Sequence, residues 1–374
     1  MIKQKFIPLA RPKFGRLEKK LVNYCLDSGW VSSLGSFVEQ FGREFAGVVD
    51  ARWALPVGNG TAALHLALIA LGIKAGDEVL VPALTFAASA NSITYVGAKP
   101  VFVDIEPDTF NLNLKEAEAK ITYRTRAIMS VDLYGQPVDF AKVRALAKKY
   151  RLHFISDSAE SLGSLYKNKP FGGLAEVTAF SFFGNKIITT GEGGMLVTNS
   201  KKIYGTAKFY RDQAKDITVH NYYHPVIGYN YAMTNLQAAV GIGQLRCLKT
   251  FVKQKRQIAD RYRFGLATVP GLSFQTEAVY AQTNWWMFSL LVDQQQFGRS
   301  RDELMRFLAK KWIETRPFFY PLPQLPPYQP DNPNNQFPVT NKIASAGINL
   351  PSFANLSVKE QNYIIEQIKQ ARVS

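Results

Sequence analysis

The sequence predicts an α/β protein in which helices cover both faces of a mainly parallel β-sheet, with a smaller α+β domain at the C-terminal end. Two observations lead to this prediction. Short apolar runs typical of buried strands alternate with helical segments between residues 77 and 157, as in parallel sheets. The chain has 374 residues, which is enough for a large core and two domains. We place the large domain at residues 1–250 and the small domain at residues 251–374.

Composition excludes several classes of protein. The contents of 47% hydrophobic and 20% charged residues are those of a globular chain. No apolar run approaches the length of a transmembrane helix, and the basic N-terminus lacks the apolar segment of a secretory signal. The two cysteines lie far apart and the four histidines show no metal-ligand spacing. We therefore expect a reduced, cytoplasmic protein with no metal and no membrane partner.

The net charge of +16 is high, and it is compatible with nucleic acid, an acidic membrane surface or an anionic substrate as the partner. The lysines and arginines are scattered, and their small clusters fall on segments that are predicted as amphipathic helices. Such runs are usually solvated helix faces. We therefore expect an anionic substrate and no nucleic acid.

The N-terminal part is predicted to contain helices at residues 16–26, 37–45 and 62–71. The turn Asn59-Gly60-Thr61 precedes the third of these helices, which is almost wholly apolar and must be buried. A Gly-Thr turn at a helix N-terminus presents free N–H groups and a hydroxyl at the positive end of the dipole, which suits a phosphate. Ordinary capping by Asn59 or Thr61 is the alternative.

Four strands and three helices are predicted next. In a parallel sheet, ligands bind at the carboxyl ends of the strands, and this rule selects Asp104, Asp132 and Asp157. Asp157 ends a strongly apolar run, so it would either hold a cationic ring nitrogen or cap a helix. The strands are residues 77–84, 98–105, 127–135 and 152–157, and the helices are residues 86–95, 114–120 and one that contains 143–150.

Lys186 lies between two β-rich apolar runs, at residues 177–183 and 195–198, close to a cluster of glycines. Burying an ammonium costs several kcal/mol, and desolvation lowers the pKa of a lysine and makes its amine a nucleophile. Lys186 is therefore a candidate for a covalent bond with a carbonyl group. A simple loop lysine between two strands is the alternative.

The remainder is predicted to be mainly helical up to the small domain. Helices are expected at residues 203–210, 236–248 and 253–266, and the last of these would connect the two domains. The small domain would contain strands at residues 285–293 and 311–321 and helices at 301–310 and 358–371. The proline-rich segment 317–338 is interpreted as a loop whose aromatic residues pack, rather than as a linker.

Several motifs together resemble the sugar-nucleotide aminotransferases of the DegT/DnrJ/EryC1/StrS family. The resemblance covers almost the whole chain and implies fold type I of the pyridoxal phosphate (PLP) enzymes, which is the aspartate aminotransferase-like fold. It also implies a homodimer with shared active sites, or a tetramer built from such dimers. The motifs are WVSS, GNGTAALHLAL, GDEVLVPALTF, SDSAES, FSFFGNKIITTGEGGM, GYNYAMTNLQAA and ETRPFFYP.

The resemblance assigns roles to individual residues. Lys186 would hold PLP covalently and then move a proton, and Asp157 would pair with the ring nitrogen. Phe86 would stack on the ring, and Glu160 would lie near its 3-oxygen. The cofactor phosphate would be bound by Gly60, Thr61 and Ser181 and by the partner subunit's Asn230, with Asn235 as the alternative for that contact. Substrate binding would involve Ser33, Arg316 and Tyr320.

The implied reaction moves the amino group of L-glutamate to the 4-keto group of a nucleotide-linked 6-deoxyhexose, GDP-4-keto-6-deoxymannose being the expected substrate. A UDP- or dTDP-linked ketone is the alternative. A sugar dehydratase of the same family would have histidine in place of Lys186. Four places depart from the family pattern. Gly42 replaces a common glutamate, Ala232 a common arginine and Pro323 a common histidine, and the aspartate strand reads SDSAES where EDxAE is more usual. These departures bear on the substrate rather than on the reaction.

Overall fold

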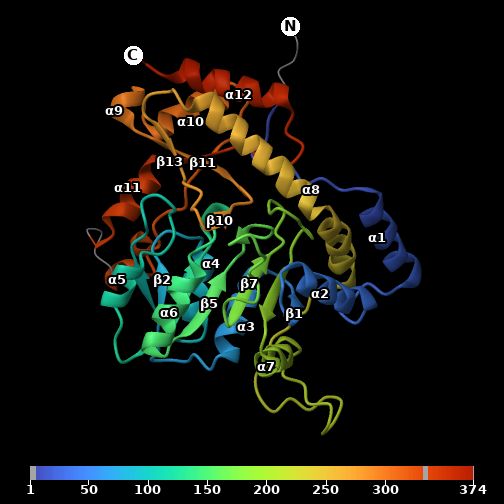
Figure 1. Ribbon diagram of the computed structural model, residues 1–374. Helices are drawn as coiled ribbons and strands as arrows, with labels where there is room; N and C mark the ends of the chain where they lie inside the picture. The colour runs from blue at the N-terminus through green and yellow to red at the C-terminus, as the bar shows by residue number, and fades with distance from the viewer. Residues whose placement is uncertain (1–5, 332–335, 374) are drawn as a thin grey trace.

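The computed structural model describes residues 6–331 and 336–373. Its centre is a seven-stranded sheet in the order β1-β8-β7-β5-β4-β2-β3, in which β8 alone runs antiparallel to its neighbours (Figure 1). The predicted mainly parallel sheet is confirmed. The strands are β1 (Trp53–Val57), β2 (Glu78–Pro82), β3 (Lys99–Val103), β4 (Thr125–Val131), β5 (His153–Asp157), β7 (Val177–Ser181) and β8 (Gly194–Thr198).

Helices cover both faces of this sheet (Figure 1). Successive side chains of a strand point to opposite faces. Two neighbouring residues of β7, Ala179 and Phe180, accordingly belong to different core clusters, one on each face of the sheet. One face carries α2 (Ser36–Val48), α6 (Phe140–Tyr150) and the first half of α8 (Asn235–Leu266). The other carries α3 (Gly60–Ala70), α4 (Ala87–Tyr95) and α7 (Lys201–Arg211). Outside these layers, α1 (Arg16–Ser28) packs on α8 and α5 (Leu114–Ala119) on α6.

The helix α8 corrects one prediction. Two helices, at residues 236–248 and 253–266, were expected, but the structure has one continuous helix of 32 residues. It begins at a capping box in which the Thr234 hydroxyl and the Gln237 side chain each bind the other residue's backbone N–H. Residues 249–252 contain no glycine or proline that would interrupt it. The expected domain boundary at residue 250 falls inside this helix, and the division into two domains stays a prediction.

The C-terminal region forms a four-stranded antiparallel sheet in the order β12-β13-β11-β9. The sequence predicted α10 (Arg301–Lys310) and α12 (Val358–Ala371) to the residue. The expected strand at residues 311–321 is reduced to β12 (Arg316–Pro317), and β9 (Leu272–Phe274), β13 (Gly347–Leu350), α9 (Gln294–Phe297) and α11 (Pro338–Ala346) were not predicted. The strand β11 is Phe288–Val292, and a separate two-residue pair joins β6 (Leu165–Tyr166) and β10 (Ala281–Gln282).

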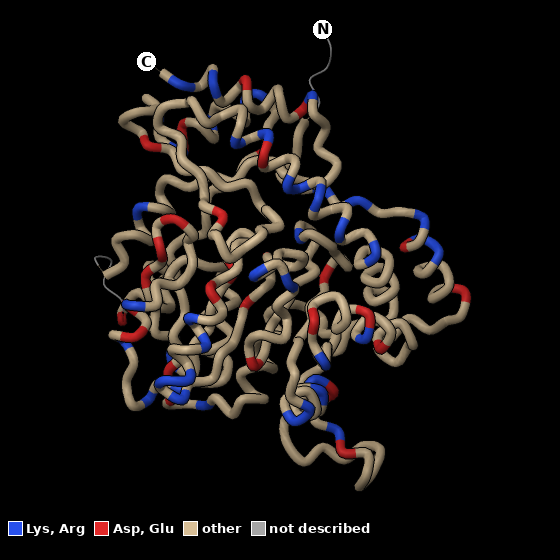
Figure 2. Tube along the Cα trace, viewed as in Figure 1, with Lys and Arg blue, Asp and Glu red and all other residues tan. Residues whose placement is uncertain are grey.

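Within its described part, the proline-rich segment packs as expected, since Phe318, Leu322 and Phe337 are buried. It contains the 3₁₀ turns η2 (Leu322–Gln324) and η3 (Gln329–Asp331), and a third, η1 (Leu133–Gly135), follows β4. None of the helices in the described ranges is long and apolar enough to cross a bilayer. Lysines and arginines occur in every layer of the molecule (Figure 2).

Candidate active site

A cavity of about 380 Å³ opens at the carboxyl ends of three neighbouring strands. Val131 ends β4, Asp157 ends β5 and Ser181 ends β7, and all three line the cavity. This is the edge of the sheet at which the sequence placed the ligand. The predicted site residues that the fold brings to this cavity are Gly60, Thr61, Phe86, Asp157, Glu160, Ser181, Lys186 and Arg316.

The N-terminus of α3 forms one wall. The Asn59 side chain caps the helix by accepting from the backbone N–H of Ala62 at 2.8 Å, so Asn59 provides the ordinary cap. A Cβ at position 60 would lie 3.0 Å from the Cβ of Ser181, and glycine therefore allows this close approach. Thr61 and Ser181 thus both line the cavity beside the N-terminus of α3, the positive end of a helix dipole, and this arrangement suits an anion.

The carboxylate of Asp157 is buried at the base of the cavity. Its oxygens accept from the Ser89 hydroxyl at 2.7 Å and from the backbone N–H of Ala159 at 3.2 Å. Residues 158–164 form turns, so the interpretation of Asp157 as a helix cap is wrong. Burial raises the pKa of Asp157 above its ordinary value, while the Ser89 hydroxyl opposes this rise. Such a carboxylate is suited to share a proton with a ring nitrogen.

Lys186 lies in the loop between β7 and β8, but its side chain is only 12% exposed. Its Nζ lies 3.4 Å from Oε1 of Glu160 and 3.9 Å from the ring centroid of Trp286. Burial lowers the pKa of Lys186, against the attraction of Glu160 and Asp157. Burial also raises the pKa of Glu160, which Lys186 opposes. Both shifts favour the neutral amine, which is the nucleophilic form.

Trp286 belongs to this site, and the sequence did not reveal it. Its indole N–H donates to the carbonyl of Asn185 at 2.8 Å, and its backbone N–H donates to Oδ1 of Asn284 at 2.8 Å. Its carbonyl accepts from the Nζ of Lys255 at 2.5 Å. These contacts fix the ring beneath Lys186. No sequence signal marks the bonds to Asn185 and Lys255, because they join residues that are distant along the chain.

Lys255 is the second buried lysine near the site. It is only 7% exposed, and burial lowers its pKa to about 7. Among the described ion pairs, none involves Lys255. Its Nζ donates to the carbonyl of Trp286, so this ammonium serves the segment that supports Lys186.

Two of the three aspartates selected at strand ends do not reach the cavity. Asp104 accepts from the backbone N–H groups of Val339 and Thr340 in the first turn of α11. Asp132 accepts from the hydroxyls of Ser158 and Ser161. Both carboxylates therefore hold chain segments in place. The rule that ligands bind at the carboxyl ends of parallel strands identifies the correct edge of the sheet. At part of that edge, however, helices and turns bind the strand-end carboxylates in place of a ligand.

Three predicted site residues lie away from the cavity lining. Ser33 and Tyr320 are exposed, and Asn230 forms an isolated β-bridge with Asp212. Their roles stay predictions, and that of Asn230 was expected in a partner subunit. Asn235, the alternative to Asn230, is buried and binds the carbonyl of Trp30 and the N–H of Phe37, so its side chain is occupied within its own subunit.

Three of the departures from the family pattern also lie outside the cavity lining. A Cβ at position 42 would lie 2.8 Å from the carbonyl oxygen of Ala54, so Gly42 lets α2 approach β1, and a glutamate would require a shift. Ala232 forms a β-bridge with Val57, and Pro323 is buried in η2. None of the three replaces a residue that faces the cavity.

The residues present fit pyridoxal phosphate. A buried amine, a buried carboxylate and hydroxyls at a helix N-terminus are the groups that its aldehyde, ring nitrogen and phosphate require. The exposed ring of Phe86 lines the same cavity, with its centroid 5.8 Å from that of Phe319, and offers a face for an aromatic ring. Within residues 6–331 and 336–373, no group of three or more His, Cys, Asp or Glu side chains is placed to hold a metal ion.

Comparison with known proteins agrees with this geometry. Residues 12–369 match the DegT/DnrJ/EryC1/StrS aminotransferase family. The chain is 44% identical to the GDP-perosamine synthase of Escherichia coli O157:H7 over 98% of each chain. It is 42% identical to that of Vibrio cholerae over 97% of this chain and 98% of the relative. The solved PLP form of Spr1654 from Streptococcus pneumoniae superposes with a TM-score of 0.91 at 29% identity, over 98% of each chain.

Proposed function

Since the chain belongs to the DegT/DnrJ/EryC1/StrS aminotransferase family, we propose that it transfers the amino group of L-glutamate to C4 of GDP-4-keto-6-deoxymannose. The protein is a PLP-dependent sugar aminotransferase. The observation that carries the reaction is the buried Lys186, which faces the same cavity as Asp157 and Glu160. The GDP sugar is supported by the synthases at 44% and 42% identity. The product would be GDP-perosamine.

The chain's own groups divide the chemistry between them. When bound, PLP supplies an electron sink that stabilises negative charge at the carbon from which a proton is removed. Lys186 removes that proton from Cα of glutamate and, in the second half of the reaction, delivers a proton to C4 of the sugar. The carboxylate of Asp157 keeps the ring nitrogen protonated. Glu160, at 3.4 Å from Nζ of Lys186, holds the amine in position between the two half-reactions.

Arg316 is the cation best placed for the substrates. Its side chain is exposed and lines the cavity, and none of the ion pairs among the described residues involves it. A guanidinium with free N–H groups binds a carboxylate with two parallel hydrogen bonds. We assign it to the carboxylate of L-glutamate, and the same charge attracts the diphosphate of the nucleotide sugar.

The active form is proposed to be a homodimer. The segment 212–229 projects from the body of the molecule after α7 (Figure 1), and it exposes Ile217, Val219, Tyr222 and Ile227. Soluble monomers rarely expose apolar side chains in such a contiguous group. This surface supports an interface with a second subunit, through which the partner subunit's Asn230 would reach the phosphate. A tetramer built from two such dimers is compatible with the same contact.

The test is mass spectrometry of the product formed from GDP-4-keto-6-deoxymannose, L-glutamate, PLP and the purified protein. A GDP-linked 4-amino sugar is the expected product, and Lys186→Ala should not form it. Unchanged substrate, from protein whose PLP absorbance still responds to L-glutamate, would reject the GDP sugar and direct the assay to UDP- and dTDP-linked ketones. Wild-type turnover by Lys186→Ala would overturn the proposed mechanism.

A further inference from the structure

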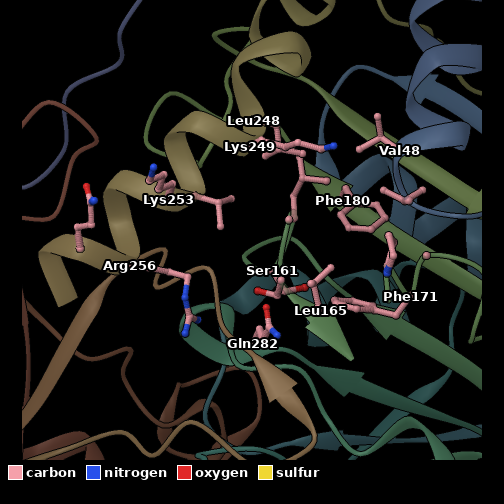
Figure 3. A pocket seen from close by; sticks show the side chains of 18 of the residues that line it. Val48, Ser161, Leu165, Phe171, Phe180, Leu248, Lys249, Lys253, Arg256 and Gln282 are labelled. Carbon is pink, nitrogen blue, oxygen red and sulfur yellow. The ribbon is translucent and has the colours of Figure 1, made fainter. Parts of the chain in front are cut away.

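A second and larger cavity, here called the rear groove, has a volume of about 530 Å³. Its walls are α8, the segment 161–172 and the end of α2 (Figure 3). Phe180 lines the rear groove, whereas its neighbour Ser181 lines the active-site cavity. Because adjacent residues of a strand point to opposite faces, the rear groove lies behind the sheet and is separate from the active site.

The floor of the rear groove is apolar and its rim is cationic. Lys249, Lys253 and Arg256 recur at the spacing of one face of α8 and line the rim (Figure 3). Arg256 is engaged by Glu277 at 2.5 Å, but among the described ion pairs none involves Lys249 or Lys253. Asp260 is the only carboxylate among the groove-lining residues described. The floor consists of Val48, Leu162, Leu165, Phe171, Phe180, Leu248 and Val252.

The polar groups of the floor are already satisfied. The Ser161 hydroxyl donates to Asp132 at 2.6 Å, and the Ser164 hydroxyl donates to the carbonyl of Gly135 at 2.7 Å. An extended peptide in the groove would leave its own backbone N–H and C=O groups unpaired, which is unfavourable. The free polar groups that the described residues offer are therefore at the rim, where Lys249 and Lys253 follow one another by one helical turn and their side chains point away from each other (Figure 3).

The walls of the rear groove are closely packed. Gly163 has a φ of +84°, and a Cβ at this position would lie 2.7 Å from Cγ2 of Val252. A Cβ at Gly172 would lie 2.7 Å from Cγ2 of Val49. Both glycines let the segment 161–172 contact the helices directly. The groove is therefore a formed feature of the fold, and its volume is within the range of small-molecule sites.

We propose that the rear groove binds a small amphiphilic anion. The apolar body of the ligand lies on the floor between α8 and Phe171, and its single anionic group pairs with one of the two rim ammonium groups, that of Lys249 or that of Lys253. Charge complementarity selects an anion, because the groove carries two ammonium groups outside the described ion pairs against one such carboxylate, that of Asp260. Because the polar groups of the floor already have hydrogen-bond partners, the part of the ligand that lies on the floor should be a hydrocarbon or aromatic body without further polar groups. This site is independent of the proposed sugar substrate.

Isothermal titration calorimetry of the PLP-loaded protein tests the proposal with two probes of similar shape. One is 8-anilinonaphthalene-1-sulfonate, and the other is N-phenyl-1-naphthylamine, which lacks the sulfonate. We expect one saturable equivalent of the sulfonate per chain. The double substitution Lys249→Gln/Lys253→Gln should weaken its binding about tenfold, the effect of losing a charged hydrogen bond, and should leave the neutral probe within about twofold because its contacts carry no charge.

A matched control is Lys201→Gln/Lys202→Gln, which removes the same charge from exposed positions on α7, across the sheet. It should bind the sulfonate like the parent protein. Leu165→Trp, which fills the floor, should weaken both probes. Absence of saturable binding, equal loss in both lysine pairs, or binding unchanged by Leu165→Trp would each overturn the proposal. PLP absorbance and far-UV circular dichroism identify any variant that fails to fold.

Discussion

Replacing Lys255 by methionine should make the stability of the protein less dependent on pH. Methionine keeps the length and apolar volume of the lysine stem and removes an ammonium that is only 7% exposed. Burial lowers the pKa of Lys255 from 10.5 to about 7. The buried charge therefore opposes folding at neutral pH, while the hydrogen bond to Trp286 favours it.

The sign and size of the effect follow from proton linkage. Below a pH of about 7, the folded and unfolded forms of the parent protein both carry the proton on Lys255, and the full penalty applies. Between about 7 and 10.5, the unfolded form binds more protons than the folded form, so the free energy of unfolding rises with pH. The rise reaches about 1.4 kcal/mol for each pH unit well above pH 7. It amounts to about 2 kcal/mol between pH 7 and pH 9, because about half of the folded molecules still carry the proton at pH 7. Lys255→Met lacks this contribution.

The assay is equilibrium unfolding in urea of both proteins at pH 7, 8 and 9, with fixed ionic strength and a fixed protomer concentration. The quantity of interest is the difference between the two free energies of unfolding, in which the other titrating groups cancel. This difference should shift by about 2 kcal/mol between pH 7 and pH 9 in favour of the parent protein. The loss of the hydrogen bond to Trp286 changes the size of this difference in free energy but not its slope against pH. A difference that is constant from pH 7 to pH 9, with equal m-values, would refute the reasoning.

Three further substitutions test the active site and its support. Asp157→Asn should retain PLP, as measured by absorbance, but should lower the transamination rate by about 10²–10⁴-fold, because an amide does not keep the ring nitrogen protonated. An unchanged rate would contradict the role of Asp157 at the ring nitrogen. Trp286→Leu removes the ring whose centroid lies 3.9 Å from Nζ of Lys186. Because the ring favours the charged amine, its removal should shift the pH midpoint for reaction of the apoprotein with PLP to lower pH by about one unit. A shift to higher pH would contradict this. Gly194→Ala should lower the free energy of unfolding by about 1–3 kcal/mol, because the new Cβ would lie 2.5 Å from the backbone of Asn59; equal stability in urea would show that this strand can move.

Some errors of the sequence analysis have a common cause. The continuous α8 was divided because the apolar pattern weakens near Lys249 and Thr250, yet both residues permit a helix. The strand β13 was missed because its four residues, Gly347–Leu350, are too short for a reliable alternation. In each case, packing against the rest of the molecule stabilises an element whose local signal is weak.

The sequence by itself determined the alternation of strands and helices between residues 77 and 157, the candidate lysine Lys186 and the carboxylate Asp157, because periodicity and short motifs depend on residues that are close along the chain. Only the tertiary structure showed that Trp286 and Lys255 support Lys186, that Asp104 and Asp132 hold other segments, and that a groove lies behind Phe180. These facts are contacts between distant segments. They depend on how side chains fill space once the sheet has formed, and no local pattern specifies this.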